Sequence, residues 1–160
     1  MKKILPRLLI VLGLAFIAIQ FFGPEKTNPA VDETKTIAAV VPMPPEVSAI
    51  ITRACYDCHS HQTRWPWYSH VAPVSWFVIS HVNEARQHLN FSEWATYDPK
   101  RMKRKLEEIK EEVEDGTMPL PSYLPLHPNA KLSPEEVQAL SAWTIAERER
   151  LAPADSLADK

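Results

Sequence analysis

The stretch ACYDCHS at residues 54–60 constrains the fold more than any other part of this chain. It contains the pattern C-x-x-C-H, in which two thiols lie on one helical turn and a histidine follows the second thiol. Two thiols at this spacing can add to the two vinyl groups of a porphyrin, and the adjacent imidazole can then bind the iron. The same cysteines would also suit zinc, thiol–disulfide exchange or a disulfide, but the histidine favours haem. The pattern predicts one covalently attached haem c, held by Cys55 and Cys58, with His59 as the proximal iron ligand.

The N-terminus has the features of a membrane-targeting segment. Basic residues at positions 2, 3 and 7 precede an almost unbroken apolar run at residues 8–22, and Gly23 and Pro24 end that run. The run is short for a membrane span, which fits a signal peptide, but no small-x-small cleavage site follows it. We therefore expect an uncleaved signal anchor, a transmembrane helix, over residues 1–23, with a cleaved signal peptide as the alternative.

This segment also predicts where the protein resides. The positive cluster should stay in the cytoplasm and send the rest of the chain across the membrane. The expected location is thus the bacterial inner membrane, crossed once, with the soluble domain in the periplasm. Cleavage of the signal would instead release the domain into the periplasm. Either location agrees with covalent haem, because bacteria attach it outside the cytoplasmic membrane.

The composition leaves room for one domain behind this segment. The chain has 160 residues, and its net charge of −2 gives no argument for a nucleic-acid partner. Residues 24–45 are polar and contain several prolines, which predicts an extended and largely unpacked tether. Residues 46–152 should form the haem-binding domain, and residues 153–160 should be a frayed tail.

Hydrophobic spacing predicts that the domain is all-α. We expect a helix over about residues 45–59, which leads directly into the haem motif, and a second over about residues 72–89. After the second helix, Ser92 is expected to cap a short turn. The expected inner stripe of the second helix consists of Val74, Phe77, Val78, His81, Val82, Ala85 and Leu89.

Capping signals predict the remaining two helices. One should begin at Pro99 with Asp98 as its N-cap and end at Gly116, a glycine stop. The other should begin after Ser133, whose side chain can form a capping box with Glu136. The expected inner faces of these two helices are formed by Met102, Leu106, Ile109 and Val113, and by Val137, Leu140, Trp143 and Thr144.

The iron also needs a distal ligand or a vacant site opposite His59. Met118 is the first candidate, because it follows a helix stop and because Pro119 and Pro121 stiffen its loop, which helps to hold a weak thioether ligand. His81 is the runner-up, although a histidine on an apolar helix face is more often a hydrogen-bonded core residue. A vacant site, open to gas or peroxide, is the third alternative. The other histidines are expected at surfaces or turns, or too close to the motif: His61, His70, His88 and His127.

Aromatic residues near the motif are candidates for the haem pocket. Trp65, Trp67, Tyr68 and Trp76 are expected to wall the haem, with an ordinary core role as the alternative. Tryptophan or tyrosine donors, or Arg64, are candidates to bind the haem propionates. A carbonyl of the proline-broken loop at residues 62–73 is expected to accept the Nδ1 proton of the proximal histidine.

Several further motifs follow the C-x-x-C-H pattern in a fixed order. They are WPWYS at 65–69, APVSW at 72–76, HV at 81–82, LNFSEW at 89–94, GTMP at 116–119, Tyr123, HPNA at 127–130, LS at 132–133 and Trp143. In these motifs the chain resembles the small bacterial haem-binding domain family, distant relatives of monohaem cytochromes c. One departure is Ala85, where the family pattern is expected to carry glycine. The resemblance implies a helical, cytochrome c-like domain with a single covalent haem facing the periplasm. It also strengthens Met118 as an iron ligand, and His81 somewhat.

These features predict a membrane-tethered monohaem c-type cytochrome that transfers one electron at a time at the periplasmic face. A haem-based sensor or small peroxidase, with a labile or vacant sixth iron site, is the alternative. An electron carrier is favoured over a catalyst, so no catalytic residue is expected. The expected partners are redox proteins and the cytochrome c maturation machinery. A thiol–disulfide oxidoreductase is a weaker alternative, because nothing in the chain resembles a thioredoxin strand–helix unit.

Overall fold

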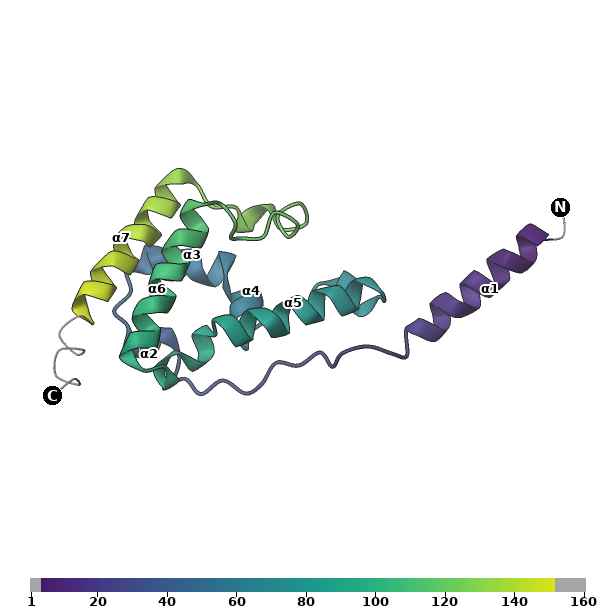
Figure 1. The fold of residues 1–160 in the computed structure, drawn as a ribbon, viewed down its shortest axis with the longest axis horizontal. Coiled ribbons are helices and arrows are strands. Elements are labelled where there is room, and N and C mark those ends of the chain that lie inside the picture. The colour runs from purple at the N-terminus through teal and green to yellow at the C-terminus, as the bar shows by residue number, and fades with distance from the viewer. Residues whose placement is uncertain (1–3, 152–160) are drawn as a thin grey trace.

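The computed structural model describes residues 4–151, and every regular element in that range is a helix (Figure 1). This confirms the prediction of an all-α domain. Short 3-10 helices join the longer elements: η1 (Trp67–His70), η2 (Phe91–Thr96) and η3 (Pro128–Ala130). The α-helices are α1 (Ile4–Ile19), α2 (Ile37–Val40), α3 (Pro45–Ala54), α4 (Tyr56–His59), α5 (Val74–His88), α6 (Pro99–Glu114) and α7 (Pro134–Arg150). The predicted tail at residues 153–160 lies outside the described residues.

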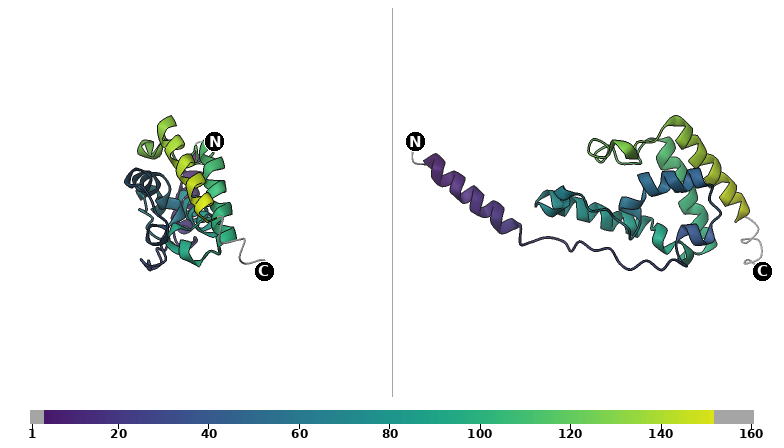
Figure 2. Two further views of the ribbon diagram at one scale, coloured as in Figure 1. Left: turned by 90° about the vertical axis from the view of Figure 1, so that its left-hand side faces the viewer. Right: turned by 180° about the vertical axis from the view of Figure 1, so that it is seen from behind.

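The N-terminal helix α1 is apolar, and none of its residues is buried. It projects beyond the rest of the molecule on the side where α5 begins (Figure 2). Its large side chains are open to solvent: Leu14, for example, is 62% exposed. Within residues 4–151, no helix combines the length and the apolar character needed to cross a membrane. The structure therefore does not support the membrane helix predicted at residues 1–23.

The hydrophobic core lies at the opposite end of the molecule, where α6 and α7 pack along each other. The predicted inner faces of these two helices are confirmed, because their apolar residues are buried or packed against the core. α3 and η2 complete the core from the side of the haem motif. Its main members are Val47, Ile50, Ile51, Phe91, Trp94, Leu106, Ile109, Val113, Leu140 and Trp143.

Local capping interactions set the ends of α6 and α7 as predicted. The Asp98 side chain accepts a hydrogen bond from the Arg101 N–H at 2.7 Å, which satisfies one of the free donors at the start of α6. Ser133 and Glu136 form the predicted capping box at the start of α7. Gly116 follows α6 with a φ of 69°, a left-handed conformation that glycine adopts without strain.

Two local predictions were wrong. α3 does not continue through the haem motif, because Cys55 has a φ of −120° and interrupts the helix between Ala54 and Tyr56. The motif therefore occupies a short helix of its own, α4. Ser92 does not cap η2; instead its N–H donates to the side chain of Asn90 at 3.0 Å, which makes Asn90 the capping residue.

Most residues of the segment between α1 and α3 are exposed, but the segment contacts the folded domain at specific points. The Arg86 guanidinium of α5 donates to the Thr27 carbonyl at 2.9 Å and to the Asn28 side chain at 2.8 Å. Further along, Ile37 and Val41 are members of the hydrophobic core. Polar groups in this segment thus find partners along α5, and its last residues belong to the folded domain.

Candidate functional site

An apolar cavity lies between α5 and the loop that follows α6. Its volume is about 390 Å³, which falls within the range of about 300–1,000 Å³ that is common for cofactor sites. α4 contributes Cys58 and His59, and Cys55 precedes it, so both cysteines and the histidine of the C-x-x-C-H motif face one space. α5 contributes the side chains that the sequence predicted for its inner stripe: Val74, Phe77, Val78, His81, Val82 and Ala85. The loop contributes Met118, Pro119, Leu120 and Leu126.

The His59 imidazole is oriented by the C-terminal end of α5. Its Nδ1 lies 3.2 Å from the Ala85 carbonyl oxygen and 3.1 Å from that of Leu89. Carbonyl oxygens only accept hydrogen bonds, so Nδ1 carries the proton and Nε2 is the nitrogen left for a metal. Burial lowers the pKa of His59, although both carbonyl contacts oppose this shift. The imidazole is therefore neutral, which is the form that binds iron.

The acceptor of the His59 proton differs from the prediction. The sequence pointed to a carbonyl in the proline-broken loop at residues 62–73, but the two acceptors belong to the last turn of α5. The Leu89 carbonyl belongs to the C-cap residue, beyond which the helix offers no donor. The Ala85 carbonyl also accepts the Leu89 N–H at 2.8 Å, and its second lone pair is available to the imidazole. The helix end also carries partial negative charge, which favours donation from the imidazole.

Cys55 and Cys58 are both free thiols. Burial raises the pKa of Cys55 to about 12 and that of Cys58 to about 11. Both groups therefore keep their protons at neutral pH in the haem-free chain. Metal binding requires thiolates, so buried and protonated thiols do not favour a metal site at these two cysteines.

Both candidate distal ligands line this cavity. The loop that holds Met118 starts directly from the end of α6, where the Thr117 and Met118 N–H groups both donate to the Glu112 carbonyl, at 3.1 and 3.0 Å. On α5, the Nδ1 of His81 lies 2.9 Å from the carbonyl oxygen of Phe77, one turn earlier, which leaves its Nε2 free. The structure thus brings both predicted ligands to the haem motif, and which of them binds iron stays a prediction.

The walls of the cavity fit a porphyrin. Several large apolar side chains remain exposed there: Phe77 is 56% exposed, Val74 is 48% and Leu126 is 64%. Apolar side chains gathered around one cavity favour an apolar occupant, because contact with water is unfavourable. The donor set is also appropriate, since an imidazole and a thioether are common axial ligands of haem iron. The residues present therefore fit a covalently held haem.

A polar cluster forms one rim of the cavity. Asp57, between the two cysteines, accepts a hydrogen bond from the Tyr123 hydroxyl at 2.9 Å and forms an ion pair with Arg64, whose Nε lies 3.2 Å away. Tyr123 stacks on His127, with ring centroids 3.8 Å apart. Burial, reinforced by the charge of Asp57, raises the pKa of Tyr123, so its hydroxyl stays protonated. This cluster ties the loop after α6 to the haem motif.

The predicted aromatic wall is only partly assembled. Trp67 and Tyr68 line the cavity, whereas Trp65 and Trp76 are not among its lining residues. Trp76 instead uses its indole N–H to bind the Phe22 carbonyl at 2.6 Å. Trp65 lies beside the Lys26 ammonium, which is 5.9 Å from its ring centroid.

Sequence reasoning missed the role of Asp57, Tyr123 and His127. His127 was expected at a surface or a turn, but it lines the cavity and packs on Tyr123. The signal was present, because Tyr123 and the HPNA motif both belong to the pattern that the chain shares with haem-binding domains. Arg64, a candidate for the propionates, is paired with Asp57. The contact between Asp57 and Tyr123 joins residues far apart in the chain, so residue spacing gave no indication of it.

Comparison with known proteins agrees with this chemistry. The model of the haem-binding domain family matches residues 14–146. That match spans most of the chain, and the protein therefore belongs to the haem-binding domain family. A search of curated proteins and a search of solved structures both found no match. Family membership supports haem as the cofactor of the cavity.

Proposed function

We propose that this protein is a monohaem c-type cytochrome, anchored in the bacterial inner membrane through α1, that transfers single electrons at the periplasmic face. The observation that carries the proposal is that Cys55, Cys58, His59 and Met118 all line one apolar cavity. Haem bound there supplies a one-electron couple between ferrous and ferric iron. Such a carrier needs no acid–base residues, and its partners are redox proteins that give or take the electron.

The two cysteines would hold the haem through thioether bonds. In each case the thiol S–H adds across a vinyl C=C bond, so that sulfur bonds to one carbon and the proton ends on the other. This addition retains every atom of the thiol and the vinyl group, and it needs no oxidant. Both thiols line the same cavity, so both vinyl groups can be reached from one short stretch of chain. The maturation machinery that joins haem to protein would be the first partner of the chain.

The iron would be held from both sides of the haem. His59 is the proximal ligand, because the α5 carbonyls leave its Nε2 free. Met118 is the proposed distal ligand, and His81 is the second choice. A thioether favours ferrous iron more than an imidazole does, so ligation by Met118 would give a higher reduction potential than ligation by two histidines.

The anchor is supported by the exposure of α1. An apolar helix without buried residues is unfavourable in water, because exposed apolar area costs about 25 cal/mol per Å². The helix has 16 residues, which corresponds to about 24 Å. A bilayer core is thicker, about 30 Å. Phe21 and Phe22 extend the apolar character beyond the helix, and local thinning of the bilayer can accommodate a short anchor.

The proposal is tested by isolating the full chain from membranes and staining a denaturing gel for haem. Covalent haem should travel with the polypeptide, and a pyridine haemochrome spectrum should give the signature of two thioether bonds. Cys58→Ala should lose that signature, whereas Thr52→Ala, on the exposed side of α3, should retain it. Haem that remains on the Cys58→Ala protein at the wild-type level would contradict covalent attachment through the motif.

A further inference from the structure

The chain that leaves α1 is fixed to the beginning of α5. The Gln20 amide exchanges two hydrogen bonds with the backbone of Ala72, at 3.2 and 2.9 Å. The Trp76 indole donates to the Phe22 carbonyl at 2.6 Å. Gly23 lies so close to Trp76 that a Cβ atom there would stand 2.6 Å from the indole nitrogen. These contacts determine which end of the domain lies beside α1.

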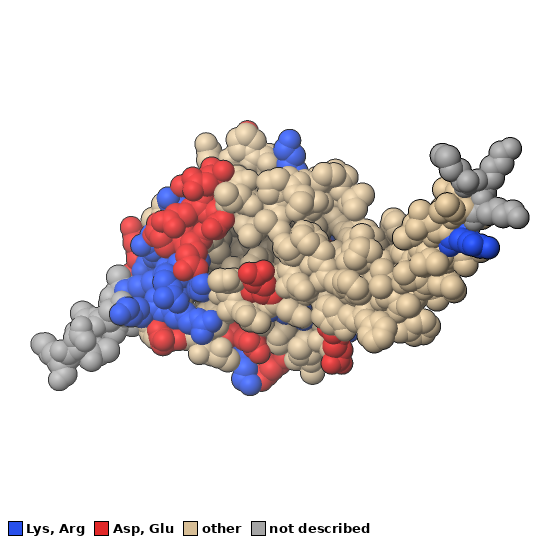
Figure 3. Space-filling view, turned by 45° about the vertical axis from the view of Figure 1, so that its right-hand side comes forward, with Lys and Arg blue, Asp and Glu red and all other residues tan. Residues whose placement is uncertain are grey.

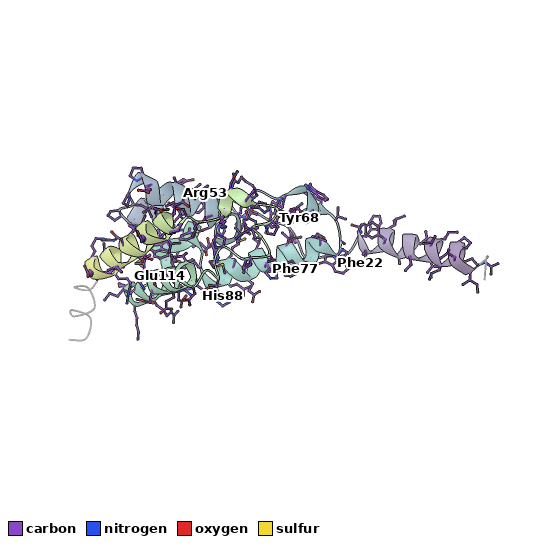
Figure 4. All side chains as sticks on the ribbon, turned by 90° about the horizontal axis from the view of Figure 1, so that it is seen from above. Phe22, Arg53, Tyr68, Phe77, His88 and Glu114 are labelled. Atoms are coloured by element: carbon purple, nitrogen blue, oxygen red, sulfur yellow. The ribbon has the colours of Figure 1, made fainter. Side chains whose placement is uncertain are left out.

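The segments that form that end of the molecule carry no charged side chains of their own, although the Lys26 ammonium reaches His70 of η1. Residues 8–24, 65–83 and 116–130 contain no Lys, Arg, Asp or Glu, although 24% of the whole chain is charged. They comprise most of α1 with its exit, η1 with most of α5, and the loop over the cavity. The face drawn in Figure 3 is largely uncharged between α1 and the middle of the molecule. Most of its charged atoms gather toward the end opposite α1, and basic atoms also lie at the outer end of α1. Figure 4 shows the same polarity: Phe22 and Phe77 lie toward α1, and Glu114 lies at the far end.

Haem accounts for only part of this apolar surface. Side chains that line the cavity, such as Phe77, would contact the haem, so their exposure in the haem-free chain indicates nothing further. Phe21, Phe22 and Val71 do not line the cavity, yet they are 82%, 71% and 37% exposed. Trp67, on the cavity rim, is 77% exposed. These four residues define a surface, here called the apolar tip, that haem alone would leave in water.

We infer that the apolar tip rests in the interface of the phospholipid bilayer that receives α1. This inference rests on the proposed membrane anchor. The tip adjoins the anchor, and its own four residues are apolar. Tryptophan and phenylalanine side chains suit the boundary between headgroups and acyl chains, and a lysine at that level, such as Lys26 beside His70, can reach the headgroups. The hydrogen bonds at Gln20 and Trp76 hold the anchor and the tip together, so insertion of α1 delivers the tip to the lipid surface. The mouth of the haem cavity then lies next to the membrane.

Lipid contact can be tested on the full, haem-loaded chain in phosphatidylcholine nanodiscs. Both native thiols are then consumed by haem, so an introduced cysteine is the single site for a benzophenone label. Labels are attached to three variants: Val71→Cys at the tip, Leu12→Cys in α1 and Lys100→Cys at an exposed position of α6. The Lys100→Cys protein serves as the matched control. After irradiation, the Val71→Cys and Leu12→Cys proteins should gain the mass of one phospholipid, and the Lys100→Cys protein should not.

The three labels separate this inference from the proposed anchor. A lipid adduct at position 12 without one at position 71 would overturn tip contact and leave the anchor intact. A chain-to-chain adduct at position 71 would also overturn it, because the tip would then be an interface between two copies. A lipid adduct at position 71 without one at position 12 would support the tip and contradict the anchor. Absence of lipid at both positions would overturn both.

Discussion

The Nδ1 atom of His59 lies 3.1 Å from the carbonyl oxygen of Leu89, the residue that ends α5. The N–H of the same peptide unit belongs to Asn90 and donates to the buried Tyr97 hydroxyl at 2.8 Å. One peptide unit is thus held at both of its polar groups, by an imidazole on one side and a phenol on the other. The orientation of the proposed proximal ligand therefore depends on a tyrosine that does not line the haem cavity.

Tyr97→Phe should raise the reduction potential of the haem. Loss of the hydroxyl frees the Leu89–Asn90 peptide unit to rotate, which weakens the hydrogen bond to His59. A weaker hydrogen bond makes the imidazole a poorer donor to ferric iron, so the ferrous state gains relative stability. The midpoint potential, measured by redox titration of the purified chain, should move in the positive direction.

Stability provides the control for this prediction. The Asn90 N–H would remain buried without its partner, so the free energy of unfolding should also fall, by about 1–3 kcal/mol. The phenyl ring keeps its packing against Trp94 and Arg101. If unfolding becomes easier while the potential is unchanged, Tyr97 has a structural role only.

Met118→Ala should remove a sulfur ligand from the iron. The oxidised wild-type protein is expected to show a weak far-red band from charge transfer between sulfur and ferric iron, and this band should vanish in the variant. His81→Ala serves as the matched control, because it removes the other candidate ligand from the same cavity and should leave the band intact.

Carbon monoxide tests the same assignment from the ferrous side. The reduced wild-type haem should resist carbon monoxide, since its sixth position is filled, and Met118→Ala should bind it readily. A wild-type spectrum that lacks the far-red band but resists carbon monoxide would move His81 ahead as ligand. Ready binding by the wild type would instead favour the sensor or peroxidase alternative.

Gly23→Ala should detach the chain after α1 from α5. The new Cβ would lie 2.6 Å from the Trp76 indole nitrogen and 2.8 Å from its Cδ1, so the indole must move and lose its bond to Phe22. Overpacking of this kind typically costs about 1–3 kcal/mol. Trypsin should then cleave after Lys26 faster than in the wild type. Gly13→Ala is the control, because no atom lies within 4 Å of its added Cβ; equal cleavage in all three proteins would show that the contact is unimportant.

Tyr123→Phe should change how the protein responds to alkali. Burial raises the pKa of Tyr123 above its ordinary value of 10.0. Above pH 10 the unfolded chain releases the phenolic proton while the folded chain keeps it, which stabilises the unfolded state. The contribution of Tyr123 to the free energy of unfolding is therefore complete below pH 10 and declines as the pH rises further. Chemical unfolding from pH 8 to 11 should show a shallower decline for the variant.

Near neutral pH the same variant should be slightly less stable. It loses the hydrogen bond to the Asp57 carboxylate, a contact with a charged acceptor that is worth about 1.5–3 kcal/mol. The loop after α6 would then be tied less firmly to the haem motif. An alkaline decline as steep as in the wild type would show that other groups cause it.

Features encoded in short stretches were predictable from the sequence. The capping box at Ser133 and the glycine stop at Gly116 depend on neighbours within a few residues, and both are present as predicted. The apolar stripe of α5 was also predicted, because a period of 3.6 residues defines a helix face without knowledge of what covers it. The structure adds that this face lines the cavity.

Features that depend on distant partners were not predictable. Trp76 was assigned to the haem pocket because it is aromatic and near the motif, but it lies on the side of α5 that contacts Phe22. Proline and polar content suggested a free tether, yet the Thr27 carbonyl and the Asn28 side chain have a partner in Arg86, almost sixty residues later. Composition predicts the conformation of a segment in isolation. It does not predict these contacts, because they form only when α5 lies beside the segment.

α5 lies between the chain that leaves α1, the proposed anchor, and His59, the proposed proximal ligand. Its first residues bind the chain that leaves α1, and its last carbonyls orient His59. The helix has 15 residues, so these two ends stand about 22 Å apart. Electron tunnelling depends steeply on distance, and here the separation between the anchor's exit and the proximal ligand is fixed by the number of helical turns. Lengthening α5 by one turn would add about 5 Å to that separation.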